Sequence, residues 1–291
     1  SLISCQAIIQ SPFGSAVIAT LSIAFDNVFV LSFTGSPIAF KFLSNADLVE
    51  HWGILKREVF IAIWILVVLG LVLYLFGKIR FPHDPKKVSL KPPRLIFGIV
   101  FGAFLIYLIP GLTNTSYANL KLLSGFPPPL FYSIYEKDTK GPLGLKAYNE
   151  FEKGIKVAAE ENKPILLDFT GLACVNCRKM EEQVWSKPEI YELIKEDYVL
   201  ISLYVDDDAQ LPDEKQFIYE KPEGGTKSIE TVGNKWATFQ TVNFKNNSQP
   251  YYVLMTSDYE LLQKPKGYEP NQEKFEEFLE SGLKNFKKNE E

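Results

Sequence analysis

Two cysteines three positions apart are the residues of this chain best suited to chemistry. Cys174 and Cys177 enclose Val175 and Asn176 in a CxxC motif. Residues 164–170 form a short apolar run that predicts a strand, and residues 174–185 have the pattern of a helix. At a helix start, unpaired N–H groups and the helix dipole stabilise a thiolate at Cys174, and Cys177 lies one turn further on. We therefore expect a redox-active dithiol.

Two other interpretations of the motif need weighing. A zinc site needs four ligands, usually two such pairs or cysteines with histidines. The third cysteine is Cys5, and the histidines, His51 and His83, both precede residue 130. The sequence therefore predicts no metal and no His-dependent active site in the second half. An inert structural disulfide stays open as an alternative, although so short a ring restricts the unfolded chain little.

The elements around the motif alternate between helices and strands. Further helices are predicted at residues 145–161, 188–195, 232–244 and 271–286, a strand at 198–205, and a hairpin at 251–256 and 260–263. Residues 206–249 otherwise form a long polar loop, of the kind that often binds partners. This order predicts an α/β domain, and a CxxC between strand and helix in such a domain is typical of a thioredoxin-like fold.

Composition distinguishes the second half of the chain, which contains the CxxC motif, from the first half. The chain has 291 residues, 46% of them hydrophobic and 23% charged, which excludes a disordered or collagen-like protein. Residues 1–130 carry 10 Lys and Arg against 5 Asp and Glu, whereas residues 131–291 carry 21 against 30. The net charge of −4 and the lack of a basic block argue against nucleic acid as a partner.

The first half contains two long uncharged runs, residues 59–77 and 95–112. Each is long enough to cross the hydrocarbon core of a bilayer, so we expect a transmembrane helical hairpin within residues 40–112. The connecting residues 78–94 carry six Lys or Arg and one acid, Asp84. The positive-inside rule then places this loop in the cytoplasm and everything after residue 112 outside it.

Two segments remain less defined. Residues 1–39 are apolar but interrupted by Ser, Gly, Pro and Asp26; a cleaved signal peptide fits poorly, and one or two further membrane segments are considered. Residues 113–145 are expected to be a periplasmic linker, either a plain loop or, because of the Pro127–Pro129 run, an extended spacer. The thioredoxin-like domain is expected at residues 146–291.

Several segments together resemble a known family. Residues 168–185 (DFTGLACVNCRKMEEQVW), 40–60 (FKFLSNADLVEHWGILKREVF) and 267–283 (GYEPNQEKFEEFLESGL) are similar to the membrane and C-terminal domains of the DsbD family of thiol:disulfide interchange proteins, in its Bacteroidota-type form. The resemblance covers about residues 40–291. It implies a bacterial inner-membrane protein with a periplasmic domain that reduces partner disulfides, including disulfide isomerases and proteins of cytochrome c maturation, without a cofactor.

The resemblance also implies roles for individual residues. Cys174 would be the attacking thiol and Cys177 the resolving one. Asp168 matches the buried acid behind the dithiol and Glu181 a second acid near it, while the neighbouring Glu182 is expected to be solvated. A carboxyl in apolar surroundings has a raised pKa and can exchange protons with a thiol near neutral pH.

Substrate contacts follow from the same resemblance. Pro250 matches the cis-proline that faces the dithiol, and with Val175, Asn176 and Leu172 it is expected to contact the substrate. Leu172 and Ala173 stand where many relatives have an aromatic residue.

The family's membrane domain passes electrons through its own cysteine pair, whereas the first half here has Cys5 alone. The electron donor is thus expected to be either such a pair, missing from a fragment, or a separate protein. The alternative function is a non-catalytic, membrane-tethered binding or chaperone module.

Overall fold

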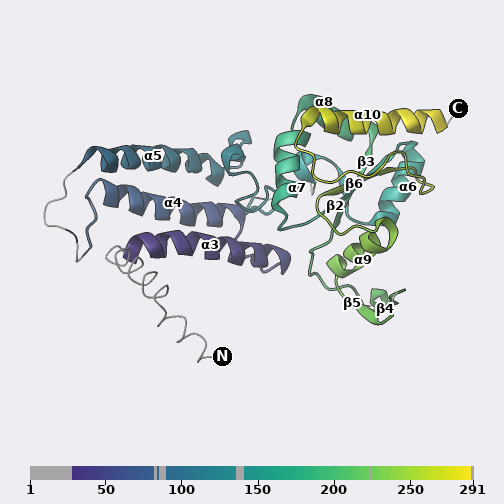
Figure 1. Ribbon diagram of the computed structural model, residues 1–291, viewed down its shortest axis with the longest axis horizontal. Helices are drawn as coiled ribbons and strands as arrows, with labels where there is room; N and C mark the ends of the chain where they lie inside the picture. Colours follow the sequence, from purple (N-terminus) through teal and green to yellow (C-terminus); the bar gives the residue numbers. More distant parts are fainter. Residues whose placement is uncertain (1–27, 82–83, 85–89, 136–140, 223, 290–291) are drawn as a thin grey trace, which may run out of the picture. The chain divides into compact units, whose positions relative to one another are not determined.

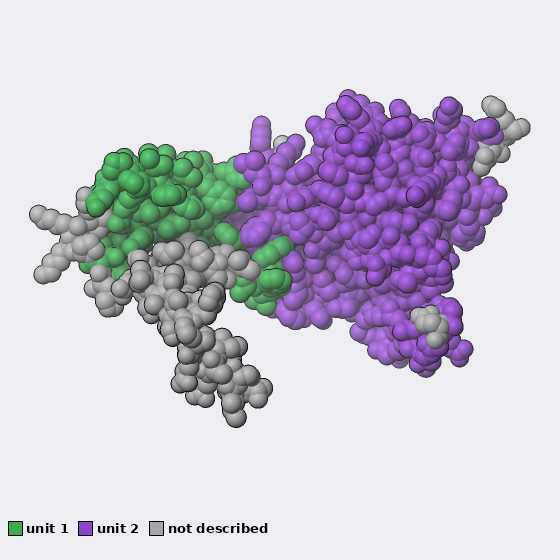
Figure 2. Space-filling view, in the orientation of Figure 1, with its two compact units in different colours: residues 1–43, 62–109 green, residues 44–61, 110–291 purple. Residues whose placement is uncertain are grey.

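The computed structural model describes residues 28–81, 84, 90–135, 141–222 and 224–289. Most of the uncertain segment 1–39 lies outside these residues. The chain divides into two compact units (Figure 2): unit 1 contains residues 1–43 and 62–109, and unit 2 contains residues 44–61 and 110–291.

Apolar helices dominate the first part of the chain. They are α3 (Val28–Val49), α4 (Arg57–Leu75) and α5 (Pro92–Leu108), the last continued by the 3-10 turn η1 (Ile109–Leu112). The segments Arg57–Leu75 and Pro92–Leu112 have mean hydropathies of 2.7 and 2.4 and are long enough to cross a membrane. Both predicted apolar helices are therefore confirmed as helices. α3 crosses the boundary expected at residue 40.

Arg94 closes the turn between α4 and α5. Its Nε donates a hydrogen bond to the Leu75 carbonyl at 2.7 Å, its Nη2 bonds the Tyr74 carbonyl, and its guanidinium lies over the Tyr74 ring. The last carbonyls of a helix have no partner within the helix, so a cation here satisfies them and also complements the helix dipole.

A four-stranded mixed sheet forms the centre of unit 2 (Figure 1). Its order is β1–β3–β2–β6, with β1 (Ala147–Tyr148), β2 (Ile165–Thr170), β3 (Val199–Tyr204) and β6 (Tyr251–Met255). β3 runs parallel to β1 and β2, whereas β6 is antiparallel to β2. The two central strands are buried throughout, which explains their continuous apolar sequences.

Helices cover both faces of this sheet (Figure 1). One face carries Leu166, Leu200 and Leu254. It is covered by α7 (Val175–Lys179), the π-helical turn η5 (Met180–Trp185), α8 (Pro188–Glu192) with the π-helical turn η6 (Leu193–Asp197), and α10 (Gln272–Asn289). α6 (Phe151–Glu161) and α9 (Val232–Phe244) pack on the opposite face. Alternate strand residues point to alternate faces, so Asp168 shares the face of Leu166, beneath η5.

The expected α/β order is confirmed, with local corrections. Residues 147–148 form β1 rather than the start of a helix, so α6 begins at Phe151. The loop after β3 contains the 3-10 turn η7 (Asp213–Lys215) and a hairpin of β4 (Phe217–Glu220) and β5 (Thr226–Ile229), which alternating patterns did not reveal because its side chains are mostly exposed. Residues 260–263 make only an isolated bridge to β6.

The segment expected as a linker is folded. It contains the 3-10 turns η2 (Ser116–Ala118), η3 (Lys121–Leu123) and η4 (Pro142–Gly144), and it belongs to unit 2. Arg57 fixes part of it by donating hydrogen bonds to the carbonyls of Ala118 and Pro128. Among the described residues of this segment no extended spacer is observed, because Arg57 binds it at Ala118 and Pro128.

Candidate active site around the Cys174–Cys177 disulfide

The two cysteines of the CxxC motif form a disulfide at the start of α7, with Cα atoms 5.3 Å apart. Cys174 is the N-cap of the helix, and its Sγ accepts a hydrogen bond from the Cys177 backbone N–H at 3.1 Å. Cys174 is half-buried and Cys177 almost fully buried. A partner can therefore reach the first sulfur more readily than the second, as the predicted attacking and resolving roles require.

A carboxylate that the sequence reasoning missed positions the turn before Cys174. The Asp206 carboxylate accepts hydrogen bonds from the backbone N–H of Leu172 at 2.6 Å and of Ala173 at 3.0 Å. Burial raises the pKa of Asp206, against the opposing effect of these two N–H groups. Its position directly after β3 was an available signal, since the ends of parallel strands meet at one edge of a sheet.

The side chain of Gln249, the residue before Pro250, lies next to this turn. The Gln249–Pro250 peptide bond is cis, as predicted. A Cβ at Gly171 would lie 2.5 Å from the Gln249 side chain and 3.0 Å from the Cys174 Cβ, so the proline turn and the dithiol turn meet at Gly171. A Cβ at this position would require the side chains of Gln249 and Asp206 to shift.

Of the other expected substrate contacts, Val175 and Asn176 are exposed, Val175 to 41%. Leu172 is not: it is 6% exposed and packs with Leu48 and Tyr204. The expectation that the Leu172 side chain faces a substrate is thus corrected, because residues before α4 cover it.

Asp168 is 2% exposed in the middle of β2. Burial raises its pKa well above the ordinary range, the negative charge of Glu181 adds to this effect, and Arg178 and the Ser202 hydroxyl oppose it. The Ser202 hydroxyl lies 3.5 Å from the carboxyl group. The expectation of a buried carboxyl near Glu181 therefore agrees with the geometry, and its catalytic role remains a prediction.

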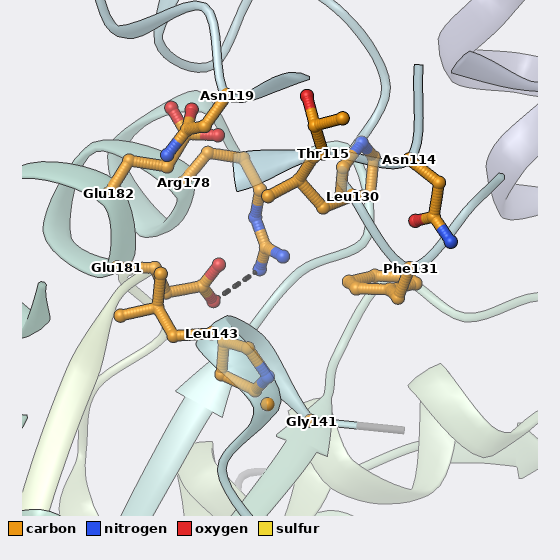
Figure 3. Close-up of a pocket in the computed structure, with 13 residues that line it drawn as sticks. Asn114, Thr115, Asn119, Leu130, Phe131, Gly141, Leu143, Arg178, Glu181 and Glu182 are labelled. Atoms are coloured by element: carbon orange, nitrogen blue, oxygen red, sulfur yellow. Dashed lines mark ion pairs between the residues drawn. The ribbon is translucent and has the colours of Figure 1, made fainter. Parts of the chain in front are cut away.

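Glu181 forms a buried ion pair with Arg178, a residue that the sequence reasoning did not single out. The distance between Arg178 Nη2 and Glu181 Oε1 is 2.8 Å (Figure 3). Burial raises the pKa of Glu181 to about 7, although Arg178 opposes this shift, and Glu182 adds to it. The i,i+3 spacing of an arginine and a glutamate was a signal, but surface pairs have the same spacing.

Glu182 was expected to be solvated and is instead 7% exposed. It belongs to the π-helical turn η5, as Glu181 does, and both line a cavity together with residues 114–115, 119, 129–131 and 141–144. The cover that these linker residues provide is the physical reason for the difference.

Residues far from the CxxC motif in the sequence also make contacts in this unit. Gly125, at a φ of +74°, lies so close to Val175 that a Cβ there would meet the Val175 carbonyl oxygen at 2.9 Å. His51 Nε2 lies 2.7 Å from the Asp207 carboxylate. The histidine thus belongs to the same unit as the disulfide, although its position in the sequence suggested no connection.

The comparison with known protein families supports this fold. Residues 151–283 match the thioredoxin-like domain family. A solved structure described as "DsbH Oxidoreductase" matches with 17% identity and a TM-score of 0.34, covering 52% of this chain and 95% of that chain. No curated protein matches the chain. The second half is a thioredoxin-like α/β domain with a CxxC disulfide, a combination that indicates thiol–disulfide chemistry.

The arrangement contains the groups that such chemistry needs. A partly accessible sulfur stands at a helix start, a second sulfur lies within bonding distance, and buried carboxyls with raised pKa values lie on the same sheet face. Within the described ranges, no group of three or more His, Cys, Asp or Glu could hold a metal ion.

Proposed function

We propose that this chain is a membrane-anchored thiol–disulfide oxidoreductase that reduces disulfides of partner proteins outside the cytoplasm. The observation that carries the proposal is the CxxC disulfide at the start of α7, with Cys174 the more accessible sulfur and the cis Gln249–Pro250 bond beside it. The matching thioredoxin-like domain family supports the same chemistry.

The reaction uses the dithiol form of the site. The Cys174 thiolate attacks one sulfur of a partner disulfide, so a mixed disulfide forms and the partner's other sulfur leaves as a thiolate that takes up a proton. Cys177 then loses its proton and attacks the Cys174 sulfur, which releases the second partner thiol. The partner gains two electrons, and the domain keeps the Cys174–Cys177 disulfide until a donor dithiol reduces it.

The buried carboxyls donate and accept the protons that this thiol–disulfide exchange moves. Because burial raises the pKa of Asp168 and of Glu181, these groups can hold a proton near neutral pH and exchange it with a thiol. Their negative forms also disfavour a thiolate, whereas the helix start favours it.

The proposed location, partners and electron donor follow from the resemblance to the DsbD family. Two apolar helices support membrane anchoring, and the basic residues 78–94 support a cytoplasmic loop, which would leave the domain in the periplasm. The partners would be periplasmic disulfide proteins, including those of disulfide isomerisation and cytochrome c maturation. The donor would be a membrane cysteine pair or a separate protein.

The test uses the full chain in detergent, mixed with insulin and an excess of dithiothreitol as the electron donor. We expect turnover that falls at least about 100-fold in Cys174→Ser, because the nucleophile is lost. Cys177→Ala should stop turnover and accumulate mixed disulfides, which identify partners in cells. Unchanged turnover in Cys174→Ser would overturn the proposal. A reduction potential below about −300 mV would favour an inert disulfide in a non-catalytic binding module.

A further inference from the structure

The Asp206 carboxylate binds the turn that leads into Cys174. Its Oδ1 accepts a hydrogen bond from the Leu172 N–H at 2.6 Å, and its Oδ2 accepts one from the Ala173 N–H at 3.0 Å. The turn is closed by the Cys174 N–H, which donates to the Gly171 carbonyl at 3.4 Å. One side chain therefore fixes the two peptide groups that precede the residue with the attacking sulfur.

The same carboxylate lies close to Cys174 itself. A Cβ at Gly171 would meet Asp206 Oδ2 at 2.8 Å and the Cys174 Cβ at 3.0 Å, so both atoms border the same small space. Both oxygens of Asp206 accept hydrogen bonds, which suits the ionised carboxylate, because a protonated carboxyl would turn one oxygen into a donor. The turn thus holds a negative charge near the attacking thiol.

Other ionisable groups near this turn are mostly paired with one another. They are His51, Asp168, Arg178, Glu181, Tyr204 and Asp207. Arg178 forms its ion pair with Glu181 at 2.8 Å, and the Asp207 carboxylate lies 2.7 Å from His51 Nε2. Burial raises the pKa of Asp206, and the two N–H groups, followed by Arg178, oppose this shift. Asp206 is therefore held chiefly by peptide groups, which carry no net charge to cancel its effect on Cys174.

We propose that Asp206 is a positioning residue for the thiol–disulfide exchange, one that fixes the turn before Cys174 and disfavours the Cys174 thiolate through its negative charge. A nearby like charge disfavours an anion, and a thiolate that is disfavoured is a poor leaving group. The inference rests on the proposed function, since it concerns the same dithiol.

The consequence concerns the mixed disulfide between Cys174 and a partner. Reversal requires the partner's other thiolate to attack the partner sulfur, which re-forms the partner disulfide and expels the Cys174 thiolate. Completion requires Cys177 to attack the Cys174 sulfur, which forms the Cys174–Cys177 disulfide and expels the partner thiolate. Because Asp206 disfavours the Cys174 thiolate, it slows reversal and leaves the second route open.

The test measures the pH dependence of Cys174 alkylation by iodoacetamide in the reduced full chain in detergent. Cys5→Ala and Cys177→Ala are present throughout, so that Cys174 is the sole thiol. The thiolate is the reacting form, so the rate rises with pH to a plateau, and the midpoint reports loss of the proton from Cys174. Asp206→Asn keeps the side-chain shape and removes the charge, and we expect its midpoint to be at least about 0.5 pH unit lower.

Asp208→Asn is the matched control, because it removes the same charge from an exposed position two residues further on. Solvent and salt screen that charge, so the midpoint should stay within about 0.2 pH unit of the value for the unaltered Asp208. If Asp206→Asn does not fold, Asp206→Ser takes its place, since its hydroxyl can still accept one of the two N–H groups. An unchanged or higher midpoint in the folded Asp206 variant, or an equal fall in Asp208→Asn, would overturn the inference. Alkylation needs no partner protein, so this result and the insulin result can fail independently.

Discussion

The two ends of the helical segment formed by α7 and η5 have opposite surroundings. At its start, Val175 and Asn176 are exposed and the Cys174 sulfur is partly accessible. Less than two turns further on, Arg178 and Glu181 are buried and paired with each other. The first end is built to meet other molecules, whereas the second keeps charges away from water. Substitutions at the first end should therefore change reactivity, and substitutions at the second should change stability and its pH dependence.

The largest effect on stability is expected for Arg178→Met. Removing the arginine leaves the buried carboxyl of Glu181 without its cation, and breaking a buried ion pair by removing one partner typically costs about 3–5 kcal/mol. The measurement is the free energy of unfolding of the full chain in urea, followed by fluorescence.

Lys195→Met provides the control for this prediction. Lys195 also forms an ion pair, with Glu196 at 2.6 Å, but both side chains are exposed. Solvent screens such a pair, so its removal should leave the urea midpoint essentially unchanged. Equal midpoints for Arg178→Met and Lys195→Met would contradict the contrast between the two ends of the segment.

The next effect is a pH dependence of stability that originates at Glu181. Its pKa is raised from 4.5 to about 7 by burial, so between these pH values the folded chain holds a proton that the unfolded chain has released. Stability therefore falls as the pH rises through this window. We expect Glu181→Gln to reduce that fall by an amount on the order of 1–3 kcal/mol between pH 5 and pH 8, measured by urea unfolding at both values.

Asp168 contributes to the same trend, since burial also raises its pKa, so part of the slope should remain in Glu181→Gln. The control is Glu189→Gln, at an exposed position, which should keep the full slope. A slope in Glu181→Gln as steep as in the unaltered chain would show that Glu181 does not titrate in this window.

The sequence predicted the first end of the segment well and the second only in part. The CxxC motif and the preceding strand are local signals, because a strand and a helix start each depend on neighbouring residues, whereas the cis-proline at Pro250 was expected from the family resemblance. The partners of the second end come from distant segments. Nothing near Glu182 indicates that residues 129–131 and 141–144 line a cavity with it, and nothing near Leu172 indicates contact with Leu48.

The same reasoning explains why Asp206 escaped notice. A lone acid after a strand is common, and its role as acceptor for Leu172 and Ala173 depends on where β3 ends relative to β2. The α/β order, in contrast, follows from hydrophobic periodicity, which depends only on burial along each element. The β4–β5 hairpin has little burial and hence no such pattern.

Within the segment formed by α7 and η5, the smallest stability effect is expected at the exposed end, for Val175→Ala. The Val175 side chain is 41% exposed, so its truncation removes little buried surface, and we expect less than about 1 kcal/mol of destabilisation in urea. Its neighbour is a sulfur that partners approach, so the rate of reaction of the reduced chain with insulin should change more than the stability does. If Val175→Ala instead destabilises the chain as much as Arg178→Met, the close approach of Gly125 to Val175 holds the domain together, and the exposed end is structural as well.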